Sequence, residues 1–377
     1  MKILLITSSY PPVLGGLQTV THTLAQHLLH QGHEVQVVTN RYPRQLAAGE
    51  TLDGVPVQRW HFLSPRLEDL KQGRADLFLA SWYYQPATRR RLLQLFQSFQ
   101  PDVVNIHYPD NQIPFVLWLR QKFDFRLVVS LHGHDILGGV DTESDAGHIR
   151  LLLQTADAVT ACSRYLLDKA IQLEPGVAEK GQTIHNGFDA AQFAGSSHYQ
   201  HPKPYIFAYG RLSRQKGFDM LLNAFAQATN HNSRIEMILA GDGEERAPLQ
   251  AQARQLGLNG RLHFWGRATS AQIVQLLNGC EFVVMPSRWE PFGLVALEAM
   301  AMGKGVLATQ VGGLPEFVQG PGTQLVAPTV EGLAGGVSDW LARTEEIKTV
   351  AAQNSKHAAS FTWNKMCGQY LEVYRTR

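Results

Sequence analysis

The stretch PYIFAYGRLSRQKGFDMLLNAF, residues 204–225, decides the fold of this chain. It opens with apolar and aromatic residues typical of a buried strand and passes through a polar, basic turn. After Gly217 its apolar residues recur at helical spacing. A buried strand that leads into a helix is the repeating unit of parallel sheets, whose helices cover the two faces. The stretch therefore predicts an α/β protein.

Short β-branched runs alternate with helical segments before and after this stretch, which predicts two doubly wound parallel sheets. Between them, residues 190–204 are polar, contain Gly, Ser and Pro and show no periodicity, which indicates a linker. The expected strands are residues 2–7, 33–39, 101–107, 125–133, 156–163, 204–210, 234–243, 261–266, 281–287 and 305–309. The expected helices include residues 20–32, 217–230, 244–256 and 270–278, and one that follows Gly293.

The composition indicates a globular, cytosolic protein of two domains. A chain of 377 residues, 44% hydrophobic and 18% charged, is too long for one ordinary core. A net charge of +2 gives no basis for nucleic-acid binding. Its three cysteines have no metal-binding spacing, and no segment has the eighteen or so apolar residues of a membrane span. We therefore expect a cytoplasmic protein, either free or peripheral on the inner face of the membrane.

Ligands of open α/β sheets bind beyond the carboxyl ends of the strands. At these ends the chain carries Gly, His, charged and short polar residues, the composition of a binding site. Two such sheets joined by a linker predict a site in the cleft between them. The strand ends are residues 8–16, 107–110, 132–135, 210–216, 241–244, 287–293 and 309–313.

The stretch EPFGLVALE, residues 290–298, follows the end of the strand expected at 281–287. It places two carboxylates around the start of an apolar helix. The free N–H groups and positive dipole end of that helix suit a phosphate. Because side chains lean toward a helix N-terminus, Glu298 can project back and accept hydrogen bonds from a ribose diol, and Glu290 can bind sugar hydroxyls. The structural alternative is that Glu298 pairs with a buried cation and Glu290 caps the helix.

Two further strand ends have the chemistry of phosphate binding. Arg211 and Lys216 offer a guanidinium fork and a mobile ammonium for the two phosphates of a nucleoside diphosphate. The alternative is a pair of solvated surface cations. Gly15 and Gly16 allow close approach of the backbone to a ligand, although a Gly-Gly turn is ordinary by itself.

The spacing of Glu290 and Glu298 resembles the E-x7-E signature of retaining glycosyltransferases of the GT-B fold, in particular family 4. The resemblance covers nearly the whole chain and includes HNGFD (185–189), YGRLSRQKGFDMLLNAF (209–225), LAGDGE (239–244) and TQVGGLPEFV (309–318). It implies an acceptor-binding Rossmann-like domain at 1–193, a nucleotide-sugar-binding domain at 194–360, and a helix at 361–377 that packs back on the first domain.

The resemblance also assigns roles to residues. His132, in LHGHD, is placed near the reacting carbon of the sugar, with His134 and Asp135 orienting it or meeting the acceptor. The implied catalytic residues are His132, Arg211, Lys216 and Glu290. The implied donor-binding residues are Gly15, Gly16, Asn186, Arg211, Lys216, Gly241, Asp242, Phe292, Gly293, Leu294 and Glu298.

The implied reaction transfers a hexosyl group from a nucleotide-sugar to an acceptor hydroxyl with retention of configuration. UDP is the favoured nucleotide and GDP the alternative. We expect no cofactor and no metal, because no Asp-x-Asp motif is present and Arg211 and Lys216 supply positive charge for the leaving diphosphate. Two other classes remain open: a nucleotide-sugar epimerase of the same fold, and a non-catalytic protein that binds nucleotide-sugars.

The acceptor is expected to be a saccharide or a lipid-linked saccharide. Residues 59–100 place Trp60, Trp82, Tyr83 and Tyr84 near three arginines at 89–91. Aromatic residues beside basic ones suit a peripheral contact of the N-terminal domain with an anionic membrane. They are equally compatible with a solvated helix over core aromatics.

Overall fold

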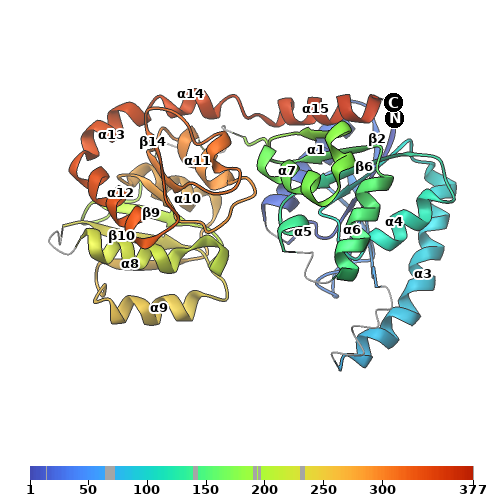
Figure 1. The fold of residues 1–377 in the computed structure, drawn as a ribbon, viewed down its shortest axis with the longest axis horizontal. Helices are drawn as coiled ribbons and strands as arrows, with labels where there is room; N and C mark the ends of the chain where they lie inside the picture. Colours follow the sequence, from blue (N-terminus) through green and yellow to red (C-terminus); the bar gives the residue numbers. More distant parts are fainter. Residues whose placement is uncertain are drawn as a thin grey trace. The chain divides into compact units, whose positions relative to one another are not determined.

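The structure is a computed structural model that describes residues 1–13, 15–63, 73–138, 143–189, 193, 197–229 and 234–376. It divides into two compact units (Figure 1). Unit 1 comprises residues 1–185 and 363–377, and unit 2 comprises residues 186–362. The border falls before the expected 193/194, because Phe188 belongs to unit 2, where its N–H donates to the carbonyl of Phe361 at 3.0 Å.

The described part of unit 1 is built on a sheet of eight strands, in the order β3-β4-β2-β1-β5-β6-β7-β8. All neighbouring strands are parallel except β3 and β4, which form an antiparallel hairpin. The strands are β1 (Lys2–Thr7), β2 (Glu34–Asn40), β3 (Gly49–Leu52), β4 (Val55–Trp60), β5 (Val103–His107), β6 (Arg126–Leu131), β7 (Ala158–Ala161) and β8 (Gly181–Thr183).

The hairpin was not predicted, although its turn has a local signal. Asp53 and Gly54 connect β3 to β4, and both have positive φ, 49° and 83°. Asp-Gly with positive φ at both positions is a preferred two-residue hairpin turn. The prediction missed it because only buried runs were counted as strands, and β3 is largely exposed.

The helices of unit 1 are α1 (Gly16–His30), α3 (Ala75–Phe99), α4 (Ile113–Arg120), α5 (His134–Leu137), α6 (Glu143–Thr155), α7 (Arg164–Leu173) and α15 (Trp363–Arg375). Helix α15 comes from the far end of the sequence but lies beside α1, near the N-terminus of the chain (Figure 1). Its apolar face, which includes Met366 and Tyr370, is part of the same core as Ile3 and Leu24. The buried hydroxyl of Tyr374 donates to Asn105 Oδ1 at 2.6 Å. These contacts make α15 an integral helix of unit 1.

Unit 2 contains a six-stranded, wholly parallel sheet in its described residues, in the order β11-β10-β9-β12-β13-β14. Its strands are β9 (Tyr205–Tyr209), β10 (Glu236–Ala240), β11 (Leu262–Gly266), β12 (Val283–Met285), β13 (Val306–Thr309) and β14 (Thr323–Val326). Its helices are α8 (Phe218–Ala228), α9 (Arg246–Gln255), α10 (Ser270–Gly279), α11 (Leu294–Ala301), α12 (Val330–Ala342), α13 (Thr344–Ala351) and α14 (Asn354–Ala358).

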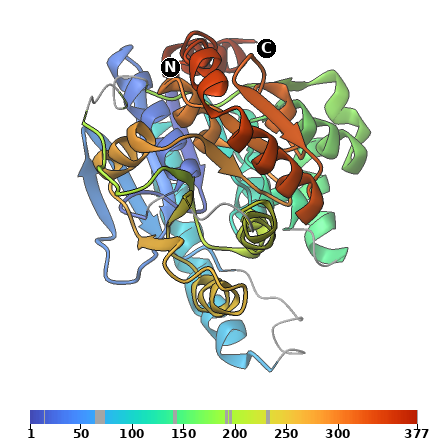
Figure 2. The same ribbon diagram turned by 90° about the vertical axis from the view of Figure 1, so that its left-hand side faces the viewer.

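Strand β9 shows how the sheet of unit 2 is covered on both faces. Ile206 and Ala208 point into a core shared with α8, α9 and α12. The alternate residues Tyr205 and Tyr209 point to the other face, where their hydroxyls bond to α10 and α11. Figure 2 shows helices of this unit on either side of the sheet. The stretch at 204–225 is β9 followed by α8, and the predicted doubly wound architecture is confirmed.

The expected linker at 190–204 is not a free connection where the structure describes it. The N–H of Tyr199 donates to the carbonyl of Gln275 at 2.9 Å, and Asn278 Nδ2 donates to the carbonyl of Ser197 at 3.0 Å. Residues 197–199 therefore lie along helix α10 of unit 2. The sequence interpretation missed this because residues 197 and 199 contribute only backbone groups to these two hydrogen bonds, which leaves no periodic pattern in the sequence.

Candidate active site

In unit 2 the loops that follow β9, β10 and β12 are packed backbone against backbone. The N–H of Leu212 donates to the carbonyl of Asp242 at 3.0 Å, and the N–H of Arg288 donates to that of Gln215 at 2.8 Å. Two glycines permit this approach. A Cβ at Gly241 would lie 1.9 Å from a backbone oxygen of the β9 loop, and one at Gly217 would lie 2.0 Å from a backbone oxygen of the β12 loop. The strand ends therefore form one rigid edge.

Lys216 and Glu290 form a partly buried ion pair at this edge. Lys216 Nζ lies 2.6 Å from Glu290 Oε2, and Ser287 Oγ donates to the same oxygen at 3.1 Å. The loop of β13 is tied to this pair, because the N–H of Gly313 donates to the carbonyl of Glu290 at 2.9 Å. The structure thus brings together two of the predicted catalytic residues, which lie 74 positions apart in the sequence.

Glu298 lies in the second turn of α11 and is bonded to Tyr209 at the end of β9. The Tyr209 hydroxyl donates to Glu298 Oε2 at 2.8 Å and lies 3.3 Å from the carbonyl of Val295. Burial raises the pKa of Glu298, against the lowering effects of the Tyr209 hydrogen bond and of the Lys216 charge. Its other carboxylate oxygen has no hydrogen-bond partner among the described residues. Sequence analysis missed Tyr209, although its place before Gly210 at a strand end was a usable signal.

Helix α11 begins at the site without a side-chain cap. Gly293 stands at the N-cap position with φ 111°, and a Cβ there would lie 2.6 Å from Leu314 Cδ2 and 3.2 Å from Glu290 Cγ. Glycine is thus required by both its backbone angle and the lack of space. The neighbouring Phe292 is buried and packs against Phe317, with ring centroids 4.6 Å apart. Because the side chain of Phe292 is packed in this way, an anion at the start of α11 would meet backbone groups of residues 292–294, including the N–H of Leu294.

Arg211 differs from Lys216 in its surroundings. Its side chain is 77% exposed and lies 3.8 Å from Glu244, a weak surface contact. The two residues predicted to bind the diphosphate therefore have different partners, Glu244 for Arg211 and Glu290 for Lys216. In this structure Arg211 is a solvated surface cation, which was the alternative interpretation of its sequence position. Lys216, in contrast, belongs to the buried group around Glu290.

The remaining predicted donor-binding residues of unit 2 are accounted for as follows. Asp242 accepts the N–H of Gly243 at 3.0 Å and lies near Arg246 and Arg267. The backbone hydrogen bond from Gly243 is the main cause that lowers its pKa, and the two arginines add to it. Asn186 is buried near the border of the unit.

In unit 1 the strand ends of β5 and β6 bring His107 and His132 together. His107 Nδ1 lies 3.0 Å from His132 Nε2, and the two rings are stacked with centroids 5.3 Å apart. Burial lowers the pKa of His132 to about 4 and places that of His107 well below its usual value, so both imidazoles are neutral at pH 7. His107 was noted as a strand-end residue but not as a site residue, because its partner comes from a different strand.

Sequence analysis considered that Asp135 orients the side chain of His132, but the carboxylate bonds to backbone groups instead. Its carboxylate accepts the backbone N–H groups of His132 at 2.9 Å and of Gly133 at 2.7 Å. Burial raises its pKa to about 6, against the lowering effect of these bonds. Asp135 therefore holds the backbone of the LHGHD turn, while His134 is exposed.

The predicted glycines of unit 1 stand at the start of α1. Gly15 is the N-cap and Gly16 is the first residue of the helix, and no side chain caps it. The preceding loop is fixed by the buried Arg59, whose Nη2 donates to the carbonyl of Pro11 at 2.6 Å and which also pairs with Glu50. Gly15 and Gly16 thus stand at a helix N-terminus that has no side-chain cap among the described residues.

The aromatic and basic segment of unit 1 contains two kinds of residue. Trp60 is part of the core, and the guanidinium of Arg89 lies over the ring of Trp118 at 5.2 Å. Trp82 and Tyr83 on α3 are 64% and 75% exposed. In the described residues, no helix is both long enough and apolar enough to cross a membrane.

Proteins of known structure share this fold. Sucrose-phosphate synthase from Thermosynechococcus elongatus matches with a TM-score of 0.80 at 20% identity, covering 100% of this chain and 98% of that one. The Anabaena protein HepE, solved in complex with UDP, matches with a TM-score of 0.74 at 24% identity, covering 99% of each chain. These likenesses define the class as the GT-B fold.

Sequence relatives identify the family. Residues 14–192 match Glycosyltransferase Family 4, and residues 192–357 match Glycosyl transferases group 1. An uncharacterized glycosyltransferase of Methanocaldococcus jannaschii is 29% identical over 100% of this chain and 98% of its own length. The glycogen synthase of Mycobacterium tuberculosis is 28% identical over 99% of this chain and 94% of its own. The chain belongs to the group 1, family 4 glycosyltransferases, which use nucleotide-sugars, and the predicted family is confirmed.

Proposed function

We propose that the protein transfers a hexosyl group, with retention of configuration and without a metal, from a UDP-sugar to a hydroxyl of a saccharide or lipid-linked acceptor. The observation that carries this proposal is the group of Lys216, Glu290 and Ser287 beside the uncapped start of α11. An ammonium and a helix N-terminus at one strand-end edge suit a leaving diphosphate, whose growing negative charge they would stabilise.

Each step of the proposal uses a described contact. Lys216 would divide its hydrogen bonds between Glu290 and a phosphate, and the exposed Arg211 would move onto the second phosphate. Glu290 would accept a hydroxyl of the sugar. Glu298 would accept the ribose hydroxyls through the oxygen that Tyr209 does not occupy. In this scheme positive groups of the chain take the part that Mg²⁺ takes elsewhere.

In unit 1 we propose that His132 contacts the transferred sugar as a neutral imidazole. Its low pKa makes it a poor proton acceptor, so its part is to donate or accept a hydrogen bond rather than to remove the acceptor proton. The departing phosphate oxygen would take that proton on the same face of the sugar. No described side chain is needed as a covalent nucleophile.

The test is incubation with UDP-, GDP- and ADP-sugars while nucleotide release is followed with and without saccharide and lipid-linked acceptors. We expect release from UDP-sugars that depends on an acceptor and persists in EDTA, with a product whose anomeric configuration by NMR is that of the donor. Release without acceptor together with a changed donor sugar would indicate an epimerase instead. Inversion, or loss of turnover in EDTA, would contradict the proposed mechanism.

The exposed Trp82 and Tyr83, with the exposed Arg90 and Arg91 on the same helix, support a lipid-linked acceptor reached at an anionic membrane. Flotation with vesicles of anionic lipid should show binding that weakens with salt. Replacing both aromatic residues by Ser should abolish flotation and leave UDP binding unchanged. Unchanged flotation of that variant would return α3 to the solvated-helix interpretation.

A further inference from the structure

Unit 2 carries a second cluster of chemically active side chains, at the opposite edge of its sheet from the proposed donor site. Glu236 is the first residue of β10, His263 is the second residue of β11, and His201 lies four residues before β9. These positions are at the amino ends of the strands, whereas Lys216, Glu290 and Glu298 lie beyond or above the carboxyl ends. Nothing in the proposed transfer reaction uses this cluster.

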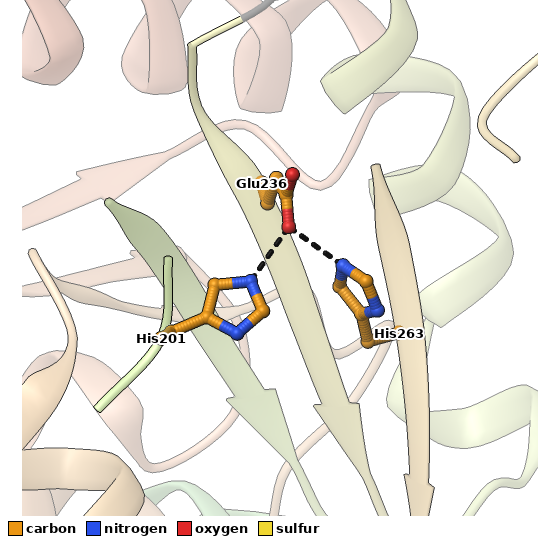
Figure 3. A group of neighbouring side chains, drawn as sticks. All are labelled: His201, Glu236 and His263. Atoms are coloured by element: carbon orange, nitrogen blue, oxygen red, sulfur yellow. Dashed lines mark hydrogen bonds and ion pairs between the residues drawn. The ribbon is translucent and has the colours of Figure 1, made fainter. Parts of the chain in front are cut away.

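Both imidazoles of the cluster point at one carboxylate oxygen (Figure 3). His201 Nε2 lies 2.6 Å and His263 Nε2 lies 2.7 Å from Glu236 Oε2. Lys203 Nζ lies 2.9 Å from the other oxygen, Oε1. Lys203 therefore occupies one oxygen of Glu236, and the two imidazole nitrogens face the other oxygen.

The cluster is sheltered on one side and open to solvent on the other. The side chains of His201 and Glu236 are 8% and 7% exposed, whereas that of His263 is 40% exposed. A metal ion could thus enter from the His263 side.

Two aromatic rings pack against His201. Its ring lies against Tyr205 with centroids 5.4 Å apart and against Tyr199 at 5.8 Å. Its Nδ1 is buried and has no hydrogen-bond partner among the described residues, so no second contact fixes which nitrogen carries the proton. Nε2 can therefore serve either as an N–H donor to Glu236 or as a metal ligand.

We propose that His201, Glu236 and His263 form a binding site for a divalent transition-metal ion of the zinc type. Two imidazole nitrogens and one carboxylate oxygen are a recognised donor set for Zn²⁺, with a fourth position open to water. Ligands of a tetrahedral zinc lie roughly 3.3 Å apart, so each ring would retreat from Oε2 by about 0.6 Å. The exposed His263 has room for this movement, and Lys203 keeps its bond to Oε1.

The consequence for the protein is structural. His201 belongs to the segment 197–204 of unit 2, whose first residues lie along α10, and the other two ligands are the first residue of β10 and the second residue of β11. A bound ion would join this segment to β10 and β11 and stabilise unit 2 by the linkage between binding and folding. This role is independent of the donor chemistry, so it survives or fails separately from the proposed function.

The test is equilibrium dialysis of the purified full chain against Zn²⁺, with metal analysis and thermal unfolding, at pH 7.5. We expect one tightly held zinc per chain and a melting temperature that rises with Zn²⁺ but not with Mg²⁺. The variant His263→Gln retains an N–H donor for Glu236 but loses the imidazole ligand. It should unfold like the wild type without metal and bind zinc at least 10- to 100-fold more weakly.

A control separates this site from other surface imidazoles. His27 and His30 lie in the last turn of α1 and could hold zinc adventitiously. His30→Gln should leave the tightly bound zinc in place. If His263→Gln binds zinc as the wild type does, or if no zinc remains after dialysis, the cluster is a hydrogen-bonded structural group and the proposal is wrong.

Discussion

At the scale of single residues, one tyrosine explains how a carboxylate is tolerated in an apolar helix. The sequence suggested that Glu298 needs a partner, and two were considered, a ribose or a buried cation. The structure supplies the Tyr209 hydroxyl for one oxygen. A hydrogen bond to a charged acceptor offsets part of the cost of burying it, and the second oxygen stays open to a ligand.

Glu298→Gln should weaken UDP binding about tenfold or more and leave the melting temperature nearly unchanged. The amide oxygen of Gln can still accept the Tyr209 hydroxyl, but the charge that strengthens hydrogen bonds from a ribose is lost. Titration calorimetry with UDP and thermal unfolding measure the two effects. Tyr209→Phe is the matched control, which keeps the charge and should reduce affinity less. A large loss of stability with unchanged UDP affinity would make Glu298 a structural residue.

Lys216→Ala should lower kcat about 100-fold or more and also reduce the free energy of unfolding by about 1–3 kcal/mol. The loss of stability follows because Glu290 remains buried without its cation. Adding Glu290→Gln to Lys216→Ala should restore much of the stability but no activity. Arg211→Ala should lower kcat to a similar extent with no change in stability, since its side chain is 77% exposed. Full activity of either alanine variant would refute the proposed diphosphate contact.

Two residues of the LHGHD turn, His132 and Asp135, should change the stability of the protein with pH in opposite directions. The pKa of His132 is lowered from 6.5 to about 4, so between these values the unfolded chain binds a proton that the folded chain does not. Stability is therefore lost as the pH falls through this range. The pKa of Asp135 is raised from 3.8 to about 6, so between these values the folded chain binds a proton that the unfolded chain does not. The contribution of Asp135 to stability therefore increases as the pH falls through this range.

His132→Gln should therefore be less sensitive to acid than the wild type, by on the order of 2 kcal/mol between pH 7 and 4.5. Asp135→Asn should be more sensitive, because the compensating proton uptake is removed. Urea unfolding of the three proteins at the two pH values gives the comparison. Parallel pH dependence in all three would show that neither group has a shifted pKa.

At the scale of elements, glycines at strand ends determine where α8 and α11 begin. Gly217 is the N-cap of α8 and Gly293 is the N-cap of α11; both have positive φ and lie against neighbouring loops that leave no room for a Cβ. These glycines thus serve packing between loops as well as approach to a ligand. The requirement comes from atoms distant in the sequence, so a local pattern can show only that a turn is present.

Gly293→Ala should destabilise the protein by about 1–3 kcal/mol and weaken UDP binding, because the new methyl group must displace Leu314 and Glu290. Gly257→Ala is the matched control. Its φ is also positive, at 66°, but nothing lies within 4 Å of the added methyl, so the substitution should cost only about 1 kcal/mol and leave UDP binding intact. Equal effects of the two substitutions would show that backbone strain alone matters at Gly293.

At the scale of the whole molecule, the chain folds as two units with separate cores. The core around β9 and α8 contains only residues of unit 2, whereas the core around β1 contains residues of unit 1, including α15 from the C-terminal end. A unit closed by the last helix of the chain cannot be complete until that helix is made. Each unit can nevertheless unfold with its own cooperativity.

Calorimetric unfolding should therefore show two transitions, and UDP should raise the temperature of only one. At a concentration one hundred times the Kd, the ligand should stabilise the unit that binds it by about 2.7 kcal/mol. The Glu298→Gln variant identifies that unit, since its shift should be smaller at the same UDP concentration. A single transition that moves as a whole would show that the units unfold together.

Regular, buried segments could be predicted from the sequence alone, because burial on both sides of a parallel sheet leaves continuous apolar runs. Five of the six described strands of unit 2, the two-unit organisation and the family follow from such runs and from motifs at their ends, whereas the half-buried β14 was missed. The hairpin β3–β4 was missed because β3 is mostly exposed, and the place of residues 197–199 on α10 was missed because these residues contribute only backbone groups to the hydrogen bonds with that helix.

Only the tertiary structure decided which side chains that lie far apart in the chain come into contact. The ion pair of Lys216 and Glu290, the contact of His107 with His132, and the convergence of His201 and His263 on Glu236 all join different strand ends. Parallel strands bring their ends to common edges, and their order in the sheet, rather than in the sequence, sets which residues become neighbours. The residue types were readable in advance, but their partners were not.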